Sequence, residues 1–72
     1  MTRNSSSRIW RVRRRGQCLD ATLDRSGQRW RVTFALKGRV LAAMDFDTRD
    51  EATDAARARL REFERAGWTE HW

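Results

Sequence analysis

The chain alternates between apolar and polar residues from Ile9 to Phe46, and glycines interrupt this alternation. Apolar side chains at every second position are typical of strands that bury one face. The interruptions fall at Gly16, Gly27 and Gly38 and divide the alternation into four runs. The pattern therefore predicts four strands with these buried positions: Trp10 and Val12; Leu19, Ala21 and Leu23; Trp30, Val32, Phe34 and Leu36; Val40, Ala42, Met44 and Phe46.

Opposed residues of an antiparallel pair point to the same face of the sheet, so each turn must set apolar residues opposite one another. Two-residue turns at 15–16 and 26–27 satisfy this condition. A two-residue turn around Gly38 would set Leu36 opposite Arg39, so we expect a three-residue loop there instead. The expected pairs are Val12 with Leu19, Trp10 with Ala21, Leu23 with Trp30 and, through the loop 37–39, Leu36 with Val40.

A helix is predicted after the fourth strand. Thr48 and Glu51 have the spacing of a capping box, and carboxylates near the helix start with arginines toward its end suit the helix dipole. Gly67 is the expected C-terminal cap. One apolar stripe would bury the helix against the sheet, with its last two members near Trp30 or Trp10. The stripe consists of Ala52, Ala55, Ala56, Leu60 and Phe63.

The length of 72 residues suits one small domain. We expect residues 1–7, which are polar and small, to be a disordered leader. Residues 8–67 are expected to form a single α+β domain, a four-stranded antiparallel meander followed by one helix packed on one face (ββββα). Residues 68–72 form a tail with two tryptophans, which either folds back onto the core or contacts a second subunit.

The net charge of +6 resides at the amino terminus, because the first sixteen residues hold six arginines and no carboxylate. The other 56 residues are electrically balanced. Clustered guanidinium groups release counterions when they meet phosphates, so this asymmetry indicates a polyanionic partner.

Several classes of function find no support in the residues. Cys18 is the only cysteine, which excludes an internal disulfide and fits a reducing compartment. No run is long and apolar enough for a membrane span, and no apolar signal-peptide core follows the basic start, so we expect a cytoplasmic protein without a membrane partner. His71 is the only histidine, and no nucleophile–base or metal-ligand set surrounds it. We therefore expect no enzymatic activity, no metal, no cofactor and no small-molecule substrate.

The first candidate nucleic-acid interface is the basic segment 8–15, which is either the first strand or a mobile arm. A solvated edge strand kept soluble by its charge would have the same composition. If the segment is a strand, two of its arginines project away from the helix and two lie at the turn. The candidate phosphate contacts in it are Arg8, Arg11, Arg13, Arg14 and Arg15.

The second candidate is the face of the sheet away from the helix, which carries Arg29 and Arg31. The expected registers set cross-strand carboxylates beside these arginines and beside Arg11, so the charges on this face would be compensated. This face is then either a solvent-exposed surface of ion pairs or a surface that meets another protein. The expected partners are Asp24 and Asp47 for Arg29, Asp45 for Arg31, and Asp20 for Arg11, with an apolar island of Ala35, Leu41 and Ala43 beside them.

The stretch 29–39, followed by the Phe-Asp-Thr phrase at 46–48 and the alanine-rich helix start, carries a resemblance. It is similar to the sheet-plus-helix DNA-binding domains of plant Apetala-type factors and of phage tyrosine integrases. That resemblance implies DNA binding through the open sheet face, with Arg29, Arg31 and Arg39 as contacts. The aspartates that crowd these positions depart from the family pattern.

Two hypotheses for function follow. In the first, the chain is a small non-enzymatic nucleic-acid-binding protein, with DNA the favoured ligand, that contacts phosphates through its arginine-rich first strand. In the second, it is a protein-interaction or homodimerisation module that uses the open sheet face or the tryptophan tail and has no nucleic-acid role. The sequence does not choose between DNA and RNA or between single and double strands.

Overall fold

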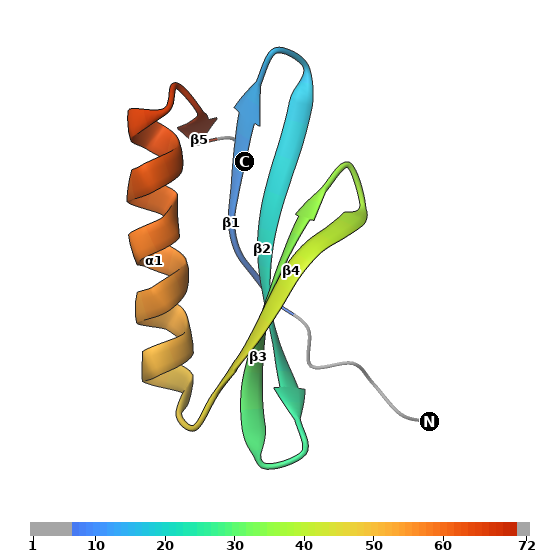
Figure 1. Cartoon of the computed structure of the whole chain (residues 1–72), viewed down its shortest axis with the longest axis vertical. Coiled ribbons are helices and arrows are strands. Elements are labelled where there is room, and N and C mark those ends of the chain that lie inside the picture. The colour runs from blue at the N-terminus through green and yellow to red at the C-terminus, as the bar shows by residue number, and fades with distance from the viewer. Residues whose placement is uncertain (1–6, 71–72) are drawn as a thin grey trace.

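The computed structural model describes residues 7–70, which form one antiparallel sheet with a single helix across one face (Figure 1). The sheet order is β4-β3-β2-β1-β5, so the first four strands form the predicted meander. The leader expected over residues 1–7 lies outside the described residues except for Ser7, which begins β1. The elements are β1 Ser7–Arg14, β2 Gln17–Ser26, β3 Arg29–Leu36, β4 Arg39–Phe46, α1 Arg49–Arg65 and β5 Thr69–Glu70.

The β1–β2 hairpin has the predicted turn at Arg15-Gly16, with Val12 opposite Leu19. The β2–β3 hairpin does not have the predicted turn. Its turn lies at 27–28, so Leu23 faces Val32 rather than Trp30. A shift of two residues keeps every side chain on the same face, which is why apolar matching alone did not distinguish the two registers.

The β3–β4 hairpin also corrects the prediction. Its turn is a two-residue turn that sets Leu36 opposite Arg39, and the three-residue loop is wrong. A β-bulge on β4 restores the buried register, because Ala35 pairs with Val40 while Phe34 pairs with Ala42. The extra residue is therefore taken up inside the strand rather than in the turn.

The core lies between the sheet and α1. Trp10 is 1% exposed, and its indole Nε1–H donates a hydrogen bond of 2.7 Å to the Ala56 carbonyl oxygen. The ring of Trp10 also contacts Phe63 edge-on, with centroids 5.7 Å apart. Ala52 and Ala56 are fully buried, so small side chains let the helix backbone approach the sheet closely. The predicted apolar stripe of the helix thus packs where it was expected.

Both ends of α1 follow the predicted capping pattern. The Thr48 hydroxyl accepts a hydrogen bond from the Glu51 backbone N–H, and the Glu51 carboxylate accepts one from the Thr48 N–H. At the other end Gly67 has a φ of 98°, a left-handed conformation that glycine adopts readily. The Gly67 and Trp68 N–H groups bond back to the helix carbonyls of Glu64 and Phe63, which is a Schellman motif.

The Schellman motif determines the path of the tail. Trp68 packs edge-on against Phe63 with ring centroids 6.0 Å apart, the apolar contact that accompanies this motif. The chain is thereby turned back toward β1, where Thr69 pairs with Arg13 and Glu70 with Val12. The fifth strand, which the sequence analysis does not predict, is the product of this reversal. Trp72 and His71 lie outside the described residues.

Candidate nucleic-acid interface

The arginines of β1 are divided between the two faces of the sheet. Trp10 and Val12 occupy the helix side, so Arg11 and Arg13 project from the open face. A register shift after Arg8 sets it opposite Thr22, which also belongs to the open face. The open face therefore receives three of the five arginines in this segment.

The other two arginines lie at the end of the hairpin. Arg14 is opposite Gln17 on the helix side, and its guanidinium approaches Gly67 at the end of α1. Arg15 occupies the turn and is exposed. The segment is thus an ordered strand among the described residues, and its arginines do not form one continuous row.

On the open face, aspartates compensate Arg11, Arg29 and Arg31 as expected. Arg11 Nε lies 2.5 Å from Asp20 Oδ1. The expected pairing of Arg29 with Asp24 is wrong, since the observed β2–β3 register sets Asp24 opposite Arg31. This face also carries the ion pairs of Arg31 with Asp45 at 2.8 Å and of Arg29 with Asp47 at 3.4 Å.

The pair of Arg31 and Asp45 is the best formed of the exposed ones. The Nε and Nη2 groups of Arg31 donate to the two Asp45 oxygens at 2.8 and 3.2 Å. These hydrogen bonds, aided by the positive charges of Arg31 and Arg29, hold the pKa of Asp45 below its ordinary value. The same hydrogen bonds, with the charge of Asp45, raise the pKa of Arg31. A phosphate approaching Arg31 would have to displace a carboxylate that already satisfies the guanidinium.

Asp45→Asn should therefore lower the free energy of unfolding at neutral pH. It should also weaken the dependence of that free energy on pH in the acid range. A carboxylate with a lowered folded-state pKa stabilises the fold above its unfolded-state pKa and loses that contribution as pH falls through the folded-state value. Wild type and variant should differ at neutral pH and converge below about pH 4. Urea unfolding along a pH series measures this. Arg31→Gln should remove the same pH-dependent contribution to the free energy of unfolding. A difference between wild type and Asp45→Asn that is constant at every pH would contradict the assignment of this contribution to the Asp45 carboxylate.

A second group of basic residues gathers at one end of the sheet. In a meander, the first and third turns lie at the same end, and the Lys37 N–H donates to the Cys18 carbonyl oxygen at 3.0 Å, which ties the two turns together. Figure 1 shows the β1–β2 turn at the end of the molecule where α1 terminates, with the β2–β3 turn at the opposite end. We call this group the basic end: Arg13, Arg14, Arg15, Lys37 and Arg39.

The side chains of the basic end are exposed, and none forms an ion pair with another residue in the described range 7–70. This separates them from Arg11, Arg29 and Arg31, whose charges are compensated. Uncompensated guanidinium and ammonium groups on neighbouring turns produce a local positive potential. Lys37 is the member that sequence reasoning missed, although its position before Gly38 and the alternation of turn ends in a meander were visible signals.

The backbone at the basic end is unusual. Arg15 and Lys37 have φ values of 51° and 52°, and the glycine after each also has a positive φ. Two positive φ values in a two-residue hairpin turn define type I′, whose first position favours Asn, Asp or Gly. The turn at the other end has glycine at its first position, Gly27, the only one of its two residues with a positive φ, as in type II′. Both turns of the basic end thus place a long basic side chain at the first position of a type I′ turn, where asparagine, aspartate or glycine is preferred.

Two other residues singled out in the sequence, Trp30 and Cys18, have surroundings that indicate a structural role. Trp30 lies partly buried on the helix side, with the Arg25 guanidinium 5.0 Å from its ring centroid. Cys18 is half-buried on the open face opposite Arg13. Within residues 7–70, no group of three histidine, cysteine or carboxylate side chains could hold a metal ion. The helix described here is too short and too polar to cross a membrane.

Comparisons with models of protein families, with curated proteins and with solved structures found no match to this chain. The resemblance to Apetala-type and integrase DNA-binding domains is therefore supported only in its coarsest part, an antiparallel sheet with one helix.

Proposed function

We propose that this domain binds nucleic acid through the phosphates, and that the basic end is its contact surface. The observation that carries the proposal is the occupation of the two type I′ turns. Arg15 and Lys37 stand at left-handed positions that glycine, asparagine or aspartate would fill at lower cost. Because the β2–β3 turn at the opposite end has glycine at its first position and so obeys the local rule, a requirement for positive charge at the basic end explains the difference.

The contact surface proposed here is the basic end, whereas the family resemblance implies the open face of the sheet. Of the three arginines in that implication, Arg29 and Arg31 pair with Asp47 and Asp45. Only Arg39 belongs to the basic end. Binding is accordingly expected to rest on phosphate contact, with little selectivity for base sequence. DNA remains the favoured ligand on the resemblance alone.

Fluorescence anisotropy with labelled single- and double-stranded DNA and RNA tests the proposal. The full chain should bind at low salt, and the logarithm of the binding constant should fall linearly with the logarithm of salt concentration. If all members of the basic end contact a DNA duplex, the slope reaches about −4.5, and affinity falls up to about 500-fold between about 50 and about 200 mM salt. Absence of binding at the lower salt concentration, or binding that ignores salt, would refute the proposal.

A further inference from the structure

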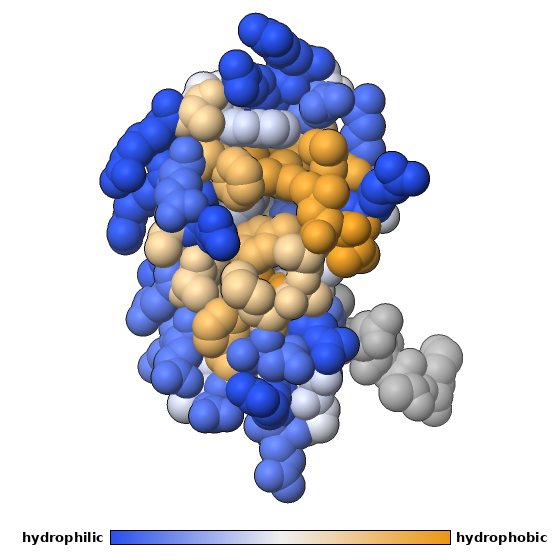
Figure 2. Space-filling view, viewed as in Figure 1, coloured by the Kyte–Doolittle hydropathy of each residue, from blue (hydrophilic) through white to orange (hydrophobic). Residues whose placement is uncertain are grey.

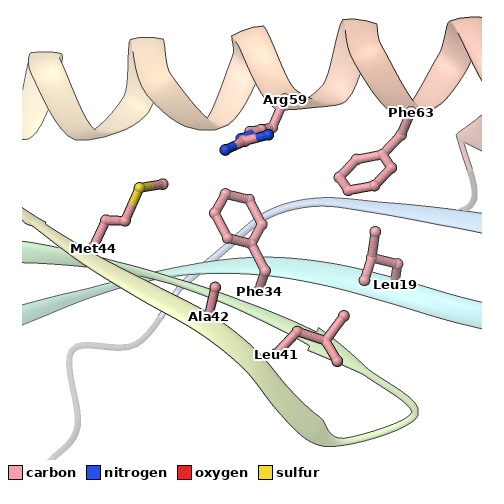
Figure 3. Close-up of a pocket in the computed structure, with 7 residues that line it drawn as sticks. All are labelled: Leu19, Phe34, Leu41, Ala42, Met44, Arg59 and Phe63. Atoms are coloured by element: carbon pink, nitrogen blue, oxygen red, sulfur yellow. The ribbon is translucent and has the colours of Figure 1, made fainter.

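An apolar hollow lies between α1 and β4 (Figure 3). Strand β4 has no neighbouring strand on its outer side among the described residues, and α1 leaves part of it uncovered. The hollow has a volume of about 220 Å³, which is room for one flat ring system. It is reached from the β4 edge, where Leu41 is 56% exposed. The lining includes Leu19, Phe34, Leu41, Ala42 and Phe63, with Arg59 on the rim.

Two aromatic rings form part of this lining and are fixed by the core. Phe34 reaches the hollow from the sheet and Phe63 from α1 (Figure 3). Each ring also contacts Trp10, with centroids 5.9 and 5.7 Å apart. Figure 2 shows apolar side chains across the middle of this face with hydrophilic ones around them. Because the rings are already held in place, a ligand that contacts them need not order them first.

The hollow borders the basic end. On the helix side of the sheet Leu19 pairs with Leu36, and Leu36 pairs with Arg39. Arg39 thus ends this row on β4, two residues before Leu41 in the wall of the hollow. It is exposed and forms no ion pair with another residue of the range 7–70. The surface therefore suits a ligand that carries a flat apolar group next to a negative charge.

We propose that the hollow receives one unpaired nucleobase while a neighbouring phosphate meets Arg39, so that the domain prefers single-stranded nucleic acid. This inference rests on the proposed function and names the form of nucleic acid that the same surface takes. A nucleotide of a single strand offers its base face next to a phosphate. Bases of a duplex are paired and stacked, and they enter a pocket only if they are extruded at a cost in free energy.

The lining also predicts how the base is held. The side chains around the hollow other than Arg59 are apolar, and the Arg59 guanidinium already donates to Glu62 at 3.1 Å. The base is therefore held by contact with its flat face rather than by hydrogen bonds to its edge. Every base has such a face, so the preference for single strands should extend over all four bases.

Fluorescence anisotropy with three labelled oligonucleotides of equal length tests the inference. They are a DNA single strand, its duplex, and a strand with the same phosphates in which abasic sites replace the bases. The intact strand should bind about 5- to 140-fold more tightly than the abasic strand, which corresponds to about 1–3 kcal/mol for one stacked base. The two strands have the same phosphates, so the dependence of their binding constants on salt concentration should agree.

A matched pair of variants locates the base. Ala42→Leu fills the hollow from an exposed position and should lower the affinity for the intact strand to that for the abasic strand, with duplex binding unchanged. Ala43→Leu makes the same change at the next residue, which is exposed on the open face opposite Thr33, and should alter none of the three affinities. Far-ultraviolet circular dichroism should show both variants folded as wild type.

The outcomes separate this inference from the proposed function. Equal affinity of the wild type for the intact and abasic strands overturns the inference and leaves phosphate contact at the basic end in place. The same holds if Ala42→Leu distinguishes the two strands as well as wild type does, or if Ala43→Leu loses the distinction equally. Absence of binding to all three oligonucleotides at low salt refutes the proposed function, and this inference with it.

Discussion

Trp10→Ala is expected to leave most of the protein unfolded at room temperature. The side chain is almost fully buried, contacts Phe34 and Phe63, and joins β1 to the helix through its bond to the Ala56 carbonyl. Truncation of a buried tryptophan costs about 3–5 kcal/mol, which is about the whole stability that a core of this size supplies. Urea unfolding followed by far-ultraviolet circular dichroism measures the loss.

Two matched variants separate the contributions of Trp10. Trp10→Phe keeps an aromatic ring and removes the indole donor, so it should lower the free energy of unfolding by less than Trp10→Ala does. Trp68→Ala removes a half-buried tryptophan that caps the end of α1 and should also cost less. If Trp10→Ala and Trp68→Ala were equally destabilising, Trp10 would not be the centre of the core.

Replacing Arg13, Arg14 and Arg15 together with glutamine is expected to abolish most nucleic-acid binding at low salt. Each phosphate contact on duplex DNA contributes about −0.9 to the slope of the logarithm of the binding constant against the logarithm of salt concentration. The slope should therefore become less steep by up to about 2.7, and the affinity should fall by on the order of 100-fold. Anisotropy titrations at several salt concentrations measure both quantities. The three side chains are exposed, so folding should be preserved.

The control for this experiment replaces three exposed arginines of α1, Arg49, Arg57 and Arg61, with glutamine. Both triple variants lose the same net charge, but only the first loses it from the basic end. The control should therefore retain nearly all of the wild-type affinity and slope. Equal losses in the two variants would mean that net charge alone attracts the ligand and that the basic end is not a site.

The candidate interface was only partly accessible to sequence reasoning. The arginines near the amino terminus were visible as a charge asymmetry, but their separation into compensated and uncompensated groups depends on cross-strand neighbours. Asp20 reaches Arg11 across a hairpin, and Asp45 reaches Arg31 from a different strand. Lys37 joined the group because the third turn is a two-residue type I′ turn, which the loop expected over 37–39 had obscured.

Local patterns in the chain determined the strands, the helix, its caps and the choice of buried face, because a period of two or of 3.6 residues is written into consecutive positions. Strand register was left open, since a shift of two residues preserves the face of every side chain and changes only the neighbours. Turn geometry resolved it, with glycine at the first position of the 27–28 turn and a bulge on β4. Long-range packing then decided the rest: the Schellman reversal that produced β5, the ion pairs that compensate the open face, and the uncovered edge at β4.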